Sequence, residues 1–104
     1  MGYLLLKRYM KDKRTPFSNI EGQRIFNELK QGLDRGEKMV VSFKDYNVVP
    51  TPFVNTAFVQ LLNHYDYNYI KRNLRIIDVN SNIQNIIINR FNHEIDSKKT
   101  LIYS

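Results

Sequence analysis

Short runs of β-branched and aromatic residues alternate along this chain with segments whose apolar residues recur at helical spacing. Runs of the first kind lie at residues 3–10, 38–43 and 74–79, and polar or turn-forming residues bound each of them. This pattern is typical of strands. Strands that alternate with helices imply a mostly parallel sheet with right-handed crossovers. We therefore expect an α/β fold in the order β-α-β-α-β-α.

The first helix is expected to begin after Ser18. Ser18 and Glu21 have the spacing of a capping box, in which the hydroxyl and the carboxylate each accept a hydrogen bond from a free backbone N–H. Gly36 is placed to end this helix, because glycine readily adopts the left-handed conformation of a helix C-terminus. The apolar residues between these signals have helical spacing: Ile25, Phe26, Leu29 and Leu33.

A second helix is expected at residues 52–65, with Thr51 as its N-cap and Pro52 at its first helical position. Residues 66–73 are polar and aromatic, which favours a loop. A third helix is expected from Asn80 or Ser81 onward. Residues 100–103 could add an edge strand or form a frayed end.

Three amphipathic helices over so small a sheet are expected to lie mainly on one face. The opposite face or an edge of the sheet would then be open to a partner or to a second copy of the chain. With 104 residues and no internal linker, we expect a single domain over residues 1–104,. Its core would span about residues 3–92, and residues 93–104 would form a tail or an edge strand.

Composition excludes several classes of protein. The sequence has no cysteine, which excludes disulfides and thiolate chemistry,. Its longest apolar runs are three residues, whereas a membrane span needs about 20,. We expect a cytoplasmic protein that does not enter the membrane.

No catalytic constellation is apparent. His64 and His93 are not in a metal-ligand motif, the serines lie in no nucleophile elbow, and the scattered glycines form no phosphate-binding loop,. We therefore expect no catalytic residues, no metal site and no cofactor, and a protein that is not an enzyme.

The net charge of +6 is concentrated near the N-terminus. A basic patch there is formed by Lys7, Arg8, Lys11, Lys13 and Arg14. Basic patches are either solvated surface or contacts for nucleic acid or acidic proteins. Tyrosines at residues 65–69 lie near basic residues at 71–75, and this mixture is compatible with stacking on single-stranded bases or with a protein interface. Two alternatives therefore stay open: a nucleic-acid-binding accessory protein, and a small inhibitor or accessory protein of a mobile genetic element.

The stretch from Lys38 to Phe58 has a distinctive order: a buried strand ending in Phe43, a short loop with a second apolar patch, then a Thr51-Pro52-Phe53 helix start. This stretch resembles the STAS domain of sulfate transporters and anti-sigma factor antagonists, and more closely the bacterial STAS-like family of unknown function. The resemblance extends over most of residues 4–92. It implies a STAS-like fold and a regulatory module that binds a protein.

The resemblance also implies where a partner binds. In the antagonists, a serine at the start of this helix is phosphorylated by a kinase, and the modification releases the partner. Pro52, which has no hydroxyl, stands at that position here, and Thr51 precedes it. The partner implied by analogy is a kinase-like ATPase or a transcription regulator. The expected contact residues are Asp45, Tyr46, Asn47, Thr51 and Asn55.

Overall fold

A computed structural model describes residues 2–10 and 17–103, with side chains described as far as residue 97. Its three strands form one parallel sheet in the order β1-β2-β3. The strands are β1 (Gly2–Leu5), β2 (Met39–Ser42) and β3 (Leu74–Ile77). The main helices are α1 (Asn19–Asp34), α2 (Thr51–Ala57), α3 (Tyr67–Asn73) and α4 (Ser81–Tyr103). Two 3₁₀ helices, η1 (Leu6–Arg8) and η2 (Val59–Asn63), complete the described elements.

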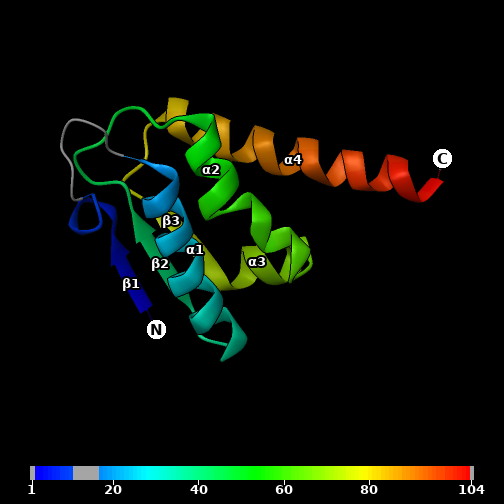
Figure 1. Ribbon diagram of the computed structural model, residues 1–104, viewed down its shortest axis with the longest axis horizontal. Coiled ribbons are helices and arrows are strands. Elements are labelled where there is room, and N and C mark those ends of the chain that lie inside the picture. The colour runs from blue at the N-terminus through cyan, green and yellow to red at the C-terminus, as the bar shows by residue number, and fades with distance from the viewer. Residues whose placement is uncertain (1, 11–16, 104) are drawn as a thin grey trace.

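The predicted α/β class and parallel sheet are confirmed, with four α-helices in place of the three expected. Both crossovers proceed in the same direction across the sheet, so right-handed connections place their helices on the same face,. On that face Leu4, Val41 and Ile76 lie opposite one another in register. Figure 1 shows α1 lying over the sheet, with α2 and α3 beside it.

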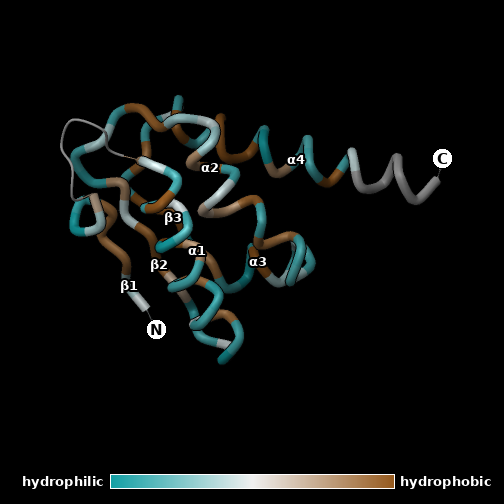
Figure 2. Tube along the Cα trace, in the orientation of Figure 1, coloured by the Kyte–Doolittle hydropathy of each residue, from teal (hydrophilic) through white to brown (hydrophobic). Residues whose placement is uncertain are grey.

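The opposite face of the sheet carries Tyr3, Val40 and Arg75, which are also in register. Tyr3 is 61% exposed and Arg75 is exposed, whereas Val40 of the central strand is buried, as are Leu4 and Val41 on the helical face. The difference between Tyr3 and Leu4 follows from the two-residue period of a strand. The hydropathy of the trace follows the same layering, with hydrophobic strands and helices that alternate between hydrophobic and hydrophilic residues (Figure 2).

Helix α1 begins as its sequence predicts. Ser18 is the N-cap, its side chain accepts a hydrogen bond from the Glu21 N–H, and Glu21 Oε1 accepts one from the Ser18 N–H at 3.0 Å. Gly36 has φ +74° and follows the last turn, as expected. Asn80 precedes helix α4 and caps it, since its Oδ1 accepts a 2.8 Å hydrogen bond from the Ile83 N–H.

Two predicted elements change character before their expected ends. The first strand stops at Leu5, the residue that pairs with the last residue of β2, Ser42. The chain then has no partner strand, and it turns into η1 with Leu6 fully buried. The second helix changes to a 3₁₀ helix after Phe58, which leaves helical geometry with φ −121° and is fully buried against Phe43 and Phe53.

One other prediction was wrong. Residues 67–73 form helix α3 and not a loop, because Asp66 caps this segment by accepting a 2.8 Å hydrogen bond from the Tyr69 N–H. Of the two alternatives for residues 100–103, the edge strand is excluded, since these residues continue α4 to Tyr103. No glycine or proline follows Ser81 to interrupt that helix,.

Candidate functional site

The three parallel strands end at one edge of the sheet, and the segments that follow them meet there (Figure 1). These segments are η1 after β1, the loop of residues 44–50 after β2, and residues 78–80 after β3. Helices α1 and α2 begin at the same edge. Open parallel sheets commonly bind ligands and partners at this carboxyl edge. The five predicted contact residues all lie in the loop of residues 44–50 or in α2.

Asp45 lies at the tip of the turn that follows β2. Its φ is +73°, a left-handed conformation that aspartate tolerates better than most residues,. Its carboxylate forms a 2.8 Å ion pair with Lys7 Nζ from η1. This hydrogen bond and the charge of Lys7 hold the pKa of Asp45 below its usual value. The structure thus joins a predicted contact residue to a residue of the predicted basic patch, a pairing that the sequence did not indicate.

Tyr46 is partly buried and anchors the loop. Its ring lies edge-on to Phe17, with the ring centroids 4.7 Å apart. Burial raises the pKa of Tyr46, and the nearby carboxylates of Glu21 and Asp45 raise it further. Tyr46 therefore contributes mainly by fixing the loop to the core, and its ring is less available to a partner than the sequence suggested.

Asn47 is fixed through its backbone and exposed through its side chain. The Asn47 carbonyl oxygen accepts a 2.8 Å hydrogen bond from Nδ2 of Asn80, in the segment after β3. Val48 follows and is 66% exposed, whereas Val49 is 5% exposed and joins the core. Val48 was not among the expected contact residues, although the apolar patch in this loop was visible in the sequence.

The prediction that Thr51 is the N-cap of the second helix was wrong by one residue. Pro50 is the N-cap of α2, and its carbonyl oxygen accepts hydrogen bonds from the N–H groups of Phe53 and Val54. Thr51 is the first helical residue, and its hydroxyl makes no capping bond. Pro52 is tolerated one position later than expected, because all the N–H groups of a first helical turn lack intrahelical partners. Thr51 is therefore exposed at the surface without a structural role in the cap.

Asn55 is partly buried one turn further along α2. Its Oδ1 accepts a 2.7 Å hydrogen bond from Arg90 Nε of α4. This bond fixes α4 against α2. Of the five predicted contact residues, Asn55 and Tyr46 are engaged inside the fold, whereas Asp45, Asn47 and Thr51 are exposed.

A hydrogen bond between a buried serine and an exposed aspartate supports the loop at its base. The hydroxyl of Ser42, at the end of β2, is fully buried and donates a 2.5 Å hydrogen bond to Oδ2 of Asp78. Ser42 Oγ also accepts a hydrogen bond from the Lys44 N–H at 3.2 Å, which fixes the first residue of the loop. Asp78 has φ +58°, so a left-handed aspartate follows both β2 and β3.

The predicted basic patch is described in part. Lys7 and Arg8 are exposed on η1, and Lys7 is paired with Asp45 as stated above. Lys11, Lys13 and Arg14 lie outside the described residues. Among the described residues, no group of three or more histidine and carboxylate side chains is placed to hold a metal ion. His64 is exposed at the end of η2, with its ring 5.7 Å from that of Phe26.

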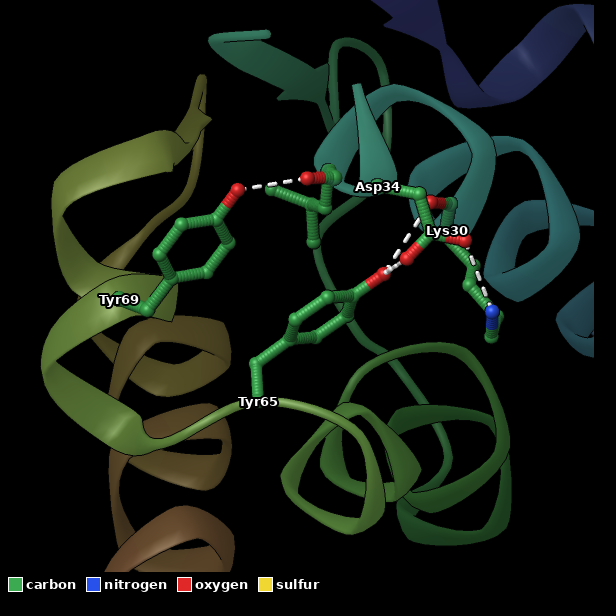
Figure 3. A network of polar contacts seen from close by, with 5 residues as sticks. Lys30, Asp34, Tyr65 and Tyr69 are labelled. Atoms are coloured by element: carbon green, nitrogen blue, oxygen red, sulfur yellow. Dashed lines mark hydrogen bonds and ion pairs between the residues drawn. The ribbon is translucent and has the colours of Figure 1, made fainter. Parts of the chain in front are cut away.

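The tyrosines considered for base stacking make contacts within the fold. Tyr65 donates a hydrogen bond to the Lys30 carbonyl oxygen and to Asp34 Oδ1, while Tyr69 donates one of 2.6 Å to the Leu33 carbonyl oxygen (Figure 3). Their rings are stacked with centroids 5.3 Å apart. This pair binds the last turn of α1, which leaves several carbonyl oxygens without intrahelical partners. It accounts for these two tyrosines structurally.

A comparison with known protein families places residues 21–84 in a family described as a STAS-like domain of unknown function. The matched segment runs from the first turn of α1 to the first turn of α4. It includes the loop of residues 44–50 and all of α2. The chain belongs to this family. The resemblance drawn from the sequence is thereby confirmed.

Comparisons of the STAS-like domain with curated proteins and with solved structures found no match. Among the residues that the structure describes, no helix has the length and apolar character needed to cross a membrane.

Proposed function

We propose that this STAS-like domain is a non-enzymatic regulatory module that binds a protein partner at the carboxyl edge of its sheet. The proposed contact surface, termed the loop–helix surface, consists of the exposed residues of the loop and of the first turn of α2. These residues are Lys44, Asp45, Asn47, Val48, Pro50, Thr51 and Pro52.

The observation that carries this proposal is the way in which the loop is held. Asp45 is paired with Lys7, Tyr46 packs against Phe17, and the Asn47 carbonyl oxygen is bound by Asn80. A loop fixed from three directions has little conformational entropy left to lose on binding. Its outward side chains meanwhile stay exposed. This combination is typical of a preorganised recognition surface on a rigid scaffold.

The chemistry of the surface suits a protein partner. Val48 and the two exposed prolines offer apolar side chains, and amide, hydroxyl and charged groups lie around them. An apolar centre with a polar rim is the usual composition of a specific protein interface. By analogy with the STAS family, the partner would be a kinase-like ATPase or a transcription regulator.

The proposal is tested by affinity capture from the native host with three variants: Asp45→Lys, Val48→Asp and Thr51→Glu. Each variant changes charge on the loop–helix surface without altering a buried residue. Glu28→Lys is the matched control, because Glu28 is exposed on α1 and the change in charge equals that of Asp45→Lys. Circular dichroism confirms that each variant is folded.

We expect a protein that is captured by the unmodified domain and by Glu28→Lys but lost with each of the three surface variants. Partners that persist with all three would show that the loop–helix surface is not the binding site.

A further inference from the structure

An apolar groove of about 200 Å³ lies beside the edge strand β3, between α3 and α4. Leu74 and Ile76 of β3 line it, together with Ile70 of α3 and Ile87 of α4. Ile88, also in its lining, is 42% exposed. The groove is thus a hydrophobic surface that the fold of the described residues does not cover.

One end of this groove is cationic. A second pocket, of about 330 Å³, shares Lys71 and Leu74 with the groove and is also lined by Lys38, Arg72 and Arg75. In the described part of the chain, none of these four cations forms an ion pair with a carboxylate. Lys38 Nζ instead donates a 2.7 Å hydrogen bond to the Arg72 carbonyl oxygen, and Lys71 Nζ lies 4.8 Å from the centroid of the Tyr67 ring.

The backbone of β3 adds hydrogen-bonding groups to the groove. The Ile77 carbonyl oxygen accepts a hydrogen bond from the Phe43 N–H, so residue 77 faces β2. Backbone groups alternate in direction along a strand, and Ile76 therefore points its N–H and C=O away from β2. Strand β3 is the last strand of the described sheet, so its outer edge pairs with no further strand there,.

We propose that this groove binds an extended peptide segment of a partner protein that carries apolar side chains and a cluster of carboxylates at one end. The apolar side chains enter the groove between α3 and α4. The carboxylates meet Lys38, Lys71, Arg72 and Arg75, and the peptide backbone pairs with the free edge of β3, as in β-strand addition.

Charge complementarity favours this occupant over two others. A second copy of the chain pairing antiparallel along the same edge about Arg75 would place this arginine opposite its own counterpart, and like charges across a strand pair are destabilising. A nucleic acid would satisfy the cations, but its phosphates and sugars have no counterpart for the isoleucine and leucine side chains of the groove. An acidic, apolar peptide satisfies both ends.

This site is separate from the loop–helix surface. Lys38 and Leu74 lie at the amino end of the strands, whereas the loop of residues 44–50 lies at the carboxyl end. The inference therefore goes beyond the proposed function, and it can be tested independently of it.

The experiment is a selection of displayed random peptides on the full-length chain, followed by solution affinities of the enriched peptides. Two groove variants are compared with two matched controls on α1. Ile88→Glu is matched by Ile20→Glu, because both residues are exposed isoleucines on helices. Arg75→Glu is matched by Arg24→Glu, since both arginines are exposed.

We expect enriched peptides that combine apolar residues with glutamate or aspartate, and affinities that fall with salt. Ile88→Glu and Arg75→Glu should each weaken binding at least about tenfold, while Ile20→Glu, Arg24→Glu and the loop variant Val48→Asp leave it unchanged. Enrichment without acidic residues, or affinities insensitive to both groove variants, would overturn the proposal. So would tighter binding of a single-stranded oligonucleotide or self-association lost in Arg75→Glu.

Discussion

The buried hydroxyl of Ser42 donates a 2.5 Å hydrogen bond to the carboxylate of Asp78 and thereby joins the carboxyl ends of β2 and β3. Ser42 is fully buried, while Asp78 is exposed and has φ +58°. Losing the acceptor leaves a buried hydroxyl without its partner, and placing alanine at a left-handed position adds strain.

This relationship predicts different costs for two substitutions of Asp78. We expect Asp78→Ala to lower the free energy of unfolding by about 2 kcal/mol. Asp78→Asn should cost less than about 1 kcal/mol, because its amide oxygen can accept the bond and asparagine tolerates positive φ. Urea denaturation of both variants measures the difference. Equal losses would contradict the expectation that an amide oxygen at position 78 retains the bond to Ser42.

The contacts of Tyr65 with the last turn of α1 predict that the stability of the fold depends on pH. Burial and the Asp34 carboxylate raise the pKa of Tyr65 above its ordinary value of 10.0. A pKa that is higher in the folded state gives stability that is fully present below the unfolded pKa and is lost as the pH rises above it. Tyr65→Phe should therefore cost about 1 kcal/mol at pH 8 and weaken the decline in stability above pH 10.

Urea denaturation of Tyr65→Phe between pH 8 and pH 11, compared with the unmodified chain, measures this effect. Tyr67→Phe is the matched control, since Tyr67 is also partly buried and makes ring contacts with Phe91 and Lys71. A decline above pH 10 that is equally steep in the unmodified chain and in Tyr65→Phe would exclude Tyr65 as its source.

Phe58 and Leu62 predict unequal costs of truncation. Phe58 is fully buried, whereas Leu62 is only partly buried. The energy of a large-to-small substitution grows with the cavity that it leaves. We expect Phe58→Ala to lower the free energy of unfolding by about 3–5 kcal/mol and Leu62→Ala by less than about 2 kcal/mol. Thermal or urea denaturation ranks the two, and the reverse order would contradict the assigned core.

The conformation of Gly36 predicts that its substitution lowers stability through backbone strain alone. Its φ is +74°, and a Cβ added there would meet no atom within 4 Å. Gly36→Ala should therefore destabilise the fold by about 1 kcal/mol through strain, and Gly36→Asn by less, because asparagine tolerates this conformation. If equilibrium denaturation finds the alanine variant as stable as the glycine, the left-handed end of α1 is not required.

Short sequence patterns correctly predicted the helices and strands whose ends are fixed by residues close together in the sequence. The capping box at Ser18 and Glu21, the Asn80 cap and the buried run of residues 38–43 each appear in the structure close to where the sequence placed them. The confirmed resemblance around residues 38–58 depends on the same kind of local pattern.

The predictions failed where contacts between residues far apart in the sequence determine the structure. Helix α3 was taken for a loop because its tyrosines give weak helical periodicity, yet Tyr69 is held by the Leu33 carbonyl oxygen of α1. The Lys7–Asp45 pair and the Asn55–Arg90 bond join residues far apart in the chain, so no local pattern indicates them. The roles of Tyr46 and Asn55 inside the fold were missed for the same reason.

The position of β2 has a consequence for how the molecule comes apart. In the sheet as described, β1 and β3 each pair with β2 and not with each other. If β2 separates from the sheet, neither β1 nor β3 keeps a paired strand. Loss of β2 should therefore unfold the whole sheet in a single cooperative step. The backbone amides that are hydrogen-bonded between β2 and its two neighbours are then expected to share one protection against hydrogen exchange, set by global unfolding,.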